Sequence, residues 1–192
     1  ASDNTAVGYA ALNVNTTGAN NTAVGKSAGL ANTTGGQNTA VGRNALQRNT
    51  TGSANTAVGD EALAFNTTGT HATAIGRYAA RSNTTGTGIT AVGHQALTGN
   101  TTGSANIAVG GFDATSGTYA ALYYNTTGSN NVAVGNGSLT TNTTGSSNTG
   151  VGFSSLKANT TGTANSAIGQ GALAAVTDGI NNSGLGKDAG FS

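Results

Sequence analysis

The sequence has no cysteine, proline, methionine or tryptophan, and only 7% of its 192 residues are charged. Without cysteine, the chain forms neither disulfides nor thiolate metal sites. A formal net charge of +1 provides no cluster of Lys and Arg for binding nucleic acid. No apolar run approaches the roughly 20 residues of a membrane helix. We therefore expect no nucleic-acid partner and no membrane insertion of this segment.

What the sequence has is regular spacing, built around 32 glycines. The pentapeptide Asn-Thr-Ala-Val-Gly at 4–8 recurs along the whole chain. Its closing glycine occurs at Gly8, Gly25, Gly42, Gly59, Gly76, Gly93, Gly110, Gly135, Gly152, Gly169 and Gly186. The step is 17 residues except between Gly110 and Gly135, where it is 25 because residues 111–118 are inserted. Such self-similarity is typical of stacked repeat folds.

The repeat predicts a β-solenoid and not a helical array. Each unit carries at least two glycines, and each glycine costs about 1 kcal/mol in a helix. We predict an all-β, parallel β-solenoid (β-roll) of about eleven 17-residue coils, forming one domain over residues 1–192 with an insertion loop at 111–118. Stacking at about 4.8 Å would give a rod of roughly 50 Å. It would also align asparagine ladders, one through Asn15, Asn32 and Asn49 and one through Asn4, Asn21, Asn38 and Asn55.

We call each set of equivalent residues a column, named after its first member. The Val7 column is always aliphatic, and the Ala6 column contains only Ala or Gly. We expect the Val7 and Thr5 columns to be buried and the Ala6 column to face the other way, against a neighbouring strand or chain. We expect a second short strand at 10–12, and a turn at 15–18 whose glycine has a positive φ.

One Val and one Leu per coil make a thin core, which favours oligomerisation. We expect a homotrimer with the Ala6 or Leu12 column near the threefold axis. The repeat runs from near Ala1 to Ser192 without polar caps, and 186–191 is still in register with 25–30. We therefore expect a segment of a longer fibre, or ends that other copies cover.

Two segments carry a resemblance to a known family. Residues 72–76 (Ala-Thr-Ala-Ile-Gly) and 165–169 (Asn-Ser-Ala-Ile-Gly) resemble the S-x-A-I-G signature of YadA-type trimeric autotransporter heads. The full unit, with its Ala-Leu-x-x-Asn-Thr-Thr-Gly half, resembles repeats of phage tail fibres along essentially the whole chain. The resemblance implies a left-handed parallel β-roll, three chains around one axis, and attachment at a cell surface or virion tail. The YadA unit is usually shorter, so the cross-section here is expected to be more triangular.

The insertion is the one feature that the repeat does not explain. Four aromatic residues and a carboxylate lie within thirteen residues, where aromatics are 5% of the chain: Phe112, Asp113, Tyr119, Tyr123 and Tyr124. Aromatic faces beside a carboxylate suit contact with carbohydrate or protein. We predict that a surface glycan or host receptor is contacted here, the alternative being a tolerated surface loop.

No constellation favours catalysis, so we expect no enzyme activity, no cofactor and no metal. His71 and His94 occupy variable positions and are expected at the surface. Asp60 and Glu61 would point to opposite faces of a strand, with Asp60 stacked between arginines of neighbouring coils in weak ion pairs. The nine Asn-Thr-Thr glycosylation sequons are interpreted as turn chemistry repeated with the unit.

The sequence thus favours a structural and adhesive extracellular fibre whose main partner is itself. Two alternatives remain open. Thr16 and Thr17 recur in nearly every coil and could order water on an ice-binding face, although their place in a turn beside glycine disfavours a flat face. The chain could also polymerise into a matrix or sheath filament.

Overall fold

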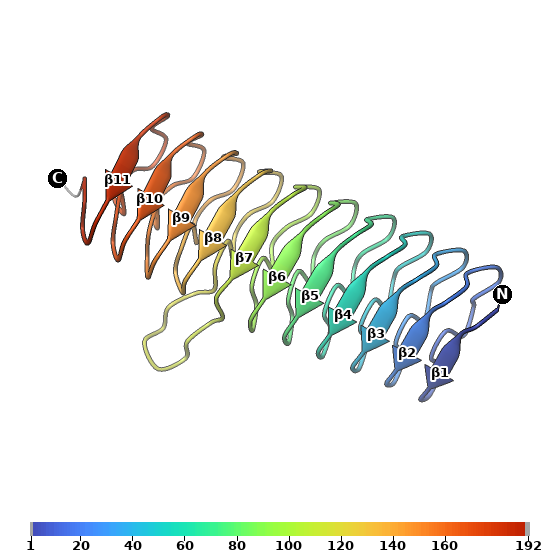
Figure 1. Ribbon diagram of the computed structural model, residues 1–192. Helices are drawn as coiled ribbons and strands as arrows, with labels where there is room; N and C mark the ends of the chain where they lie inside the picture. Colours follow the sequence, from blue (N-terminus) through green and yellow to red (C-terminus); the bar gives the residue numbers. More distant parts are fainter. Residues whose placement is uncertain (1, 191–192) are drawn as a thin grey trace.

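The structure, a computed structural model that describes residues 2–190, is a rod of stacked coils (Figure 1). Each coil contributes one three-residue strand to an eleven-stranded parallel sheet in the order β1 to β11. The strands are β1 (Thr5–Val7), β2 (Thr22–Val24), β3 (Thr39–Val41), β4 (Thr56–Val58), β5 (Thr73–Ile75), β6 (Thr90–Val92), β7 (Ile107–Val109), β8 (Val132–Val134), β9 (Thr149–Val151), β10 (Ser166–Ile168) and β11 (Ser183–Leu185). The predicted fold class is confirmed. We number the coils by their strands.

Equivalent residues pair across neighbouring coils, as in Thr5 with Thr22 and Val7 with Val24. The register persists across the insertion, where Ile107 pairs with Val132. Residues 2–190 contain no helix long and apolar enough to cross a membrane. Phe191, which the sequence places in register with Leu30, lies outside the described residues.

The expected second strand at 10–12 is wrong, because this segment forms turns. Ala10 and Leu12 have φ values of 57° and 49°, and Leu46 and Leu63 in the Leu12 column both have 50°. A 17-residue coil must reverse direction several times within a short path. Left-handed residues make these corners at a cost of roughly 1–2 kcal/mol each.

The two faces of the strand are opposite to those expected. The Ala6 column points into the coil, where Ala57 and Ala74 are fully buried. The Val7 column points outward, and Val58 and Ile75 are 36% and 43% exposed. A single coil is too narrow for large side chains on both its strand and its corner. The Leu12 column fills that interior, so the strand can contribute only Ala or Gly.

The expected placement of the Ala6 or Leu12 column near a threefold axis is therefore wrong as well. Ala57, Leu63 and Leu97 all have 0% exposure within a single chain. Neither column is available to another copy without opening the coil. The columns that remain accessible on the sheet are the Thr5 and Val7 columns.

Asparagine completes the interior in two buried ladders. In the Asn15 column, the Nδ2 of Asn49 donates to the Oδ1 of Asn32 at 2.9 Å and to the carbonyl of Gly52 at 2.9 Å, which confirms the predicted amide ladder. The Asn4 column bonds mainly to backbone: the amide N–H of Asn55 donates to the Oδ1 of Asn38 at 3.0 Å. Since the sequon asparagines use their Nδ2 groups inside the coil, the repeated Asn-Thr-Thr is explained by the fold.

The turn glycine is required for space and not for a positive φ. The Gly18 column lies outside the left-handed region, so that expectation is wrong. A Cβ on Gly52 would collide with the Oδ1 of Asn49 and the carbonyl of Gly69. The Gly8 column does need glycine's conformational freedom, since Gly59 has a φ of +135° and its added Cβ would lie 2.5 Å from the Gly76 oxygen.

Candidate recognition surface at the insertion

The insertion leaves the rod between β7 and β8 as a hairpin on an otherwise continuous coil (Figure 1). Asp113 and Thr118 form an antiparallel bridge, with N–H to carbonyl distances of 2.9 and 3.2 Å. Beneath the hairpin, the amide of Ala121 donates to the carbonyl of Gly110 at 3.1 Å. This bond closes coil 7 as in the other coils, so the rod continues without the inserted residues.

The two sides of the hairpin stem bond to different coils. The amide of Phe112 donates to the carbonyl of His94 in coil 6 at 2.8 Å. The carbonyl of Tyr119 accepts from the amide of Gly137 in coil 8 at 2.9 Å. The stem is therefore held from both sides, which positions its aromatic residues.

The Asp113 carboxylate stabilises the loop that carries it. Its Oδ1 accepts from the backbone N–H of Thr115 at 2.9 Å, and its Oδ2 accepts from the Ser116 hydroxyl at 2.7 Å. These hydrogen bonds, the Ser116 bond above all, hold the pKa of the Asp113 carboxyl below its usual value. The Asp113 carboxylate thus uses part of its hydrogen-bonding capacity inside the loop, where we expected it to be available to a receptor.

The four aromatic residues chosen from the sequence lie together. The ring centroids of Phe112 and Tyr119 are 6.0 Å apart, and Tyr119 lies 4.8 Å from Tyr123 and 5.5 Å from Tyr124. Tyr119 and Tyr124 remain 41% and 42% exposed. Interaction with the Tyr119 hydroxyl, together with burial, raises the pKa of Tyr124. The result is a clustered, partly exposed aromatic surface.

Sequence reasoning missed that this cluster extends to earlier coils. The His94 ring lies 6.0 Å from Phe112 in an edge-on arrangement and 6.3 Å from Tyr78. His94 is half-buried and its Nε2 has no hydrogen-bond partner, so the expectation of a surface histidine holds for His71 but not for His94. The available signal was the spacing: Tyr78 and His94 are 16 residues apart, almost one coil, which places them side by side.

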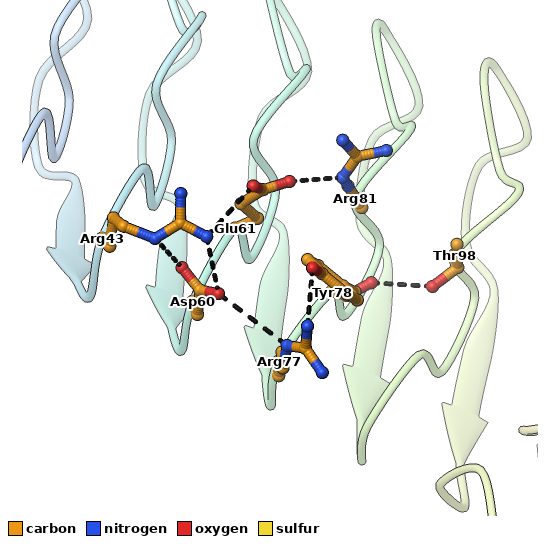
Figure 2. A network of polar contacts seen from close by, with 7 residues as sticks. All are labelled: Arg43, Asp60, Glu61, Arg77, Tyr78, Arg81 and Thr98. Atoms are coloured by element: carbon orange, nitrogen blue, oxygen red, sulfur yellow. Dashed lines mark hydrogen bonds and ion pairs between the residues drawn. The ribbon is translucent and has the colours of Figure 1, made fainter.

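Arginines and carboxylates form the other concentration of side chains, shown in Figure 2. Arg43 contacts Asp60 at 2.9 Å and Glu61 at 3.4 Å. Arg77 lies 3.8 Å from Asp60, and Arg81 lies 2.6 Å from Glu61. Asp60 therefore does lie between Arg43 and Arg77.

The two carboxylates do not point to opposite faces, as a strand would require. They lie in a turn where Glu61 has a φ of 55°, and Arg43 contacts both of them. Arg77 also donates to the Tyr78 hydroxyl at 2.8 Å, and the guanidinium of Arg81 lies 4.7 Å from the centroid of Phe65. The arginines are exposed and the two carboxylates partly so, and ion pairs this close to solvent stabilise weakly. We therefore regard the network as a solvated side of the rod.

Among residues 2–190, no three His, Asp or Glu side chains come together as a group that could hold a metal ion. Comparison of the chain with models of protein families, with curated proteins and with solved structures finds no match. The function must therefore be argued from the rod, its exposed columns and the aromatic surface.

Proposed function

We propose that this chain is a shaft or head segment of a homotrimeric extracellular fibre that mediates attachment to a surface. The rod is regular along eleven coils, which suits a spacer that holds a binding element away from its base. Within residues 2–190, the insertion interrupts that regularity, and it carries a cluster of partly exposed aromatic rings. The resemblance to trimeric adhesin heads and phage tail fibres points to the same function.

The observation that carries the association of chains is the exposed aliphatic column on the sheet, whereas the number of three chains is what the resemblance implies. Val24, Val58, Ile75, Val109 and Ile168 are all between 36% and 49% exposed. A contiguous apolar stripe along a folded chain is typical of an interaction surface.

The size of this face fits association with other copies. Eleven strands of three residues present a face of roughly 50 by 10 Å, or about 1,000 Å² when two such faces meet. This area is near the lower limit for a specific interface. Three copies that bury this face around a common axis would also form a second apolar core between the chains, which supplements the thin core of each coil.

The test is the mass of the assembled particle by sedimentation velocity. We expect the chain to sediment as a trimer and Ile75→Lys/Val109→Lys to shift it to monomer. The control is Thr68→Lys/Thr102→Lys, two exposed turn positions, which should remain trimeric. A monodisperse folded monomer of the unmodified chain would refute the assembly.

The sheet also favours a second candidate, ice binding, on a face other than the one considered from the sequence. Thr16 and Thr17 lie in turns, whereas the Thr5 column runs beside the Val7 column on the outward face of a regular sheet. Thermal hysteresis distinguishes the two functions, because a trimer covers this face and an ice-binding monomer exposes it. Hysteresis in a monomeric sample would favour ice binding.

A further inference from the structure

A groove of about 280 Å³ lies between the insertion hairpin and the coils that follow it. Thr118 and Tyr119 line it from the hairpin side, Tyr124 from coil 7, Thr141 from coil 8 and Lys157 from coil 9. This volume is close to the small end of ligand pockets, which begin at about 300 Å³. It suits one or two rings of a small ligand.

Local sequence keeps the groove open. Gly137 lies on its floor, and a Cβ there would meet the Ser154 hydroxyl at 2.9 Å and the Thr118 methyl at 3.0 Å. The hairpin therefore packs closely over Gly137, where a side chain would have to displace the Ser154 hydroxyl and the Thr118 methyl. Gly137 and the insertion together shape this side of the groove.

The two tyrosines give the groove its apolar walls. The Tyr119 and Tyr124 rings have centroids 5.5 Å apart and planes inclined by 57°, and both are about two-fifths exposed. An aromatic face binds an apolar face, and the phenol hydroxyl donates or accepts hydrogen bonds at its edge. A sugar ring presents both features, with C–H groups on its face and hydroxyls around its rim.

The polar groups that line the groove from coils 8 and 9 indicate which charge a ligand should carry. Lys157 is exposed and has no ion-pair partner among the described residues, and no carboxylate lines the groove. The Thr141 hydroxyl donates to the carbonyl of Lys157 at 2.6 Å, which leaves its oxygen free to accept from a ligand hydroxyl. An ammonium with three donors favours an anionic partner.

We infer that this groove binds a carboxylate-bearing sugar ring of an acidic polysaccharide. The ring stacks on Tyr119 and Tyr124, and its carboxylate pairs with Lys157. This inference deepens the attachment function proposed above and rests on it.

The test is calorimetric titration with trigalacturonic acid and with its methyl ester, which keeps the rings and removes the charges. We expect the acid to bind, and the ester to bind about tenfold more weakly. Lys157→Gln should weaken binding of the acid to the level of the ester. Lys26→Gln, the same change on a distant coil, should leave binding of the acid unchanged. Tyr124→Ala should weaken both ligands by about tenfold.

The repeat itself contains precedents for these variants, so they should fold. Gln47 occupies the column of Lys157, and Ala158 that of Tyr124. Equal binding of acid and ester would overturn the charge assignment, and no binding of either would overturn the site. Sedimentation of the same samples separates the two proposals: a trimer that binds no sugar refutes only the groove, and a monomer that binds it refutes only the fibre assembly.

Discussion

At the scale of residues, the fold depends on positions where no side chain fits. The Gly8 column passes so close to the next coil that an added Cβ on Gly59 would lie 2.5 Å from the Gly76 oxygen. Gly88 also has a positive φ, +62°, but nothing lies within 4 Å of its added Cβ. Ala54 and Ala105 already occupy the column of Gly88 at φ values of 57° and 54°.

These two glycines therefore make a matched pair. Gly59→Ala should destabilise the rod severely, by more than about 4 kcal/mol, because the clash is with backbone and cannot relax locally. Gly88→Ala should cost only about 1 kcal/mol, the cost of a left-handed Ala. Urea unfolding measures both; equal effects would mean that neither the φ of +135° nor the close approach of the next coil excludes a side chain from the Gly8 column.

The asparagine ladder can be tested by removing one of its asparagines and by adding one where the column lacks it. Asn83 donates to the Oδ1 of Asn66 and accepts from the Nδ2 of Asn100, both at 2.8 Å. Asn83→Val should cost roughly 2–5 kcal/mol, because it leaves buried polar groups without partners. Val176 stands where this column would have its next asparagine, and Val176→Asn should be neutral or stabilising. A tolerated Asn83→Val would show that the ladder is dispensable.

At the scale of elements, the period and the strand position could be predicted, but the direction of the side chains could not. The prediction that the Ala6 and Val7 columns point to opposite faces of the strand was correct. Only the choice of which face is buried was wrong. The usual rule that aliphatic residues are buried fails here, because Leu and Asn already fill a narrow interior. The restriction of the Ala6 column to Ala and Gly was the informative signal, and it reflects the chain's own interior.

The candidate site could also be predicted only in part, because the sequence reveals residues that are close along the chain but not those brought together by stacking. Local sequence density identified Phe112, Tyr119, Tyr123 and Tyr124, which do cluster. Lys157 could not be found in this way, because it reaches the groove only through the stacking of coil 9 near coil 7. Contacts of this kind depend on where the hairpin lies, which the repeat does not determine.

The insertion loop should respond to acid through Asp113. Its pKa is lowered in the folded protein, so the carboxylate stabilises the loop fully above the unfolded value of about 3.9. That stabilisation is lost as the pH falls through the lower folded pKa. The Thr115 amide signal in an NMR titration should therefore shift with a midpoint below about 3.9, and should cease to titrate in Asp113→Asn. A midpoint at or above that value would contradict the loop geometry.

Removing the insertion tests whether the rod needs it. Deletion of 111–118 joins Gly110 to Tyr119, and the bonds from Ala121 to Gly110 and from Gly137 to Tyr119 can stay as they are. We expect an unchanged circular dichroism spectrum and a small change in stability, together with weaker trigalacturonic acid binding, because the deletion removes the wall of the groove formed by 116–118. A deletion variant that keeps full binding would mean that the loop is only tolerated.

At the scale of the whole molecule, stability and assembly should be separable. The Ala6 column lies inside each coil and the Val7 column lies outside, so one strand supplies probes for both. Ala57→Leu should overpack the interior at a cost of roughly 1–3 kcal/mol whatever the oligomeric state. Ile75→Lys/Val109→Lys should leave the interior intact and disrupt only contacts between chains.

The concentration dependence of the melting temperature distinguishes the two effects. If folded chains associate, the melting temperature rises with protein concentration, because association stabilises the folded state by mass action. Ala57→Leu should lower the melting temperature at every concentration and keep this rise, whereas Ile75→Lys/Val109→Lys should abolish the rise. If Ala57→Leu alone abolished it, the Ala6 column would be a contact between chains, and the closed interior of the single coil would be wrong.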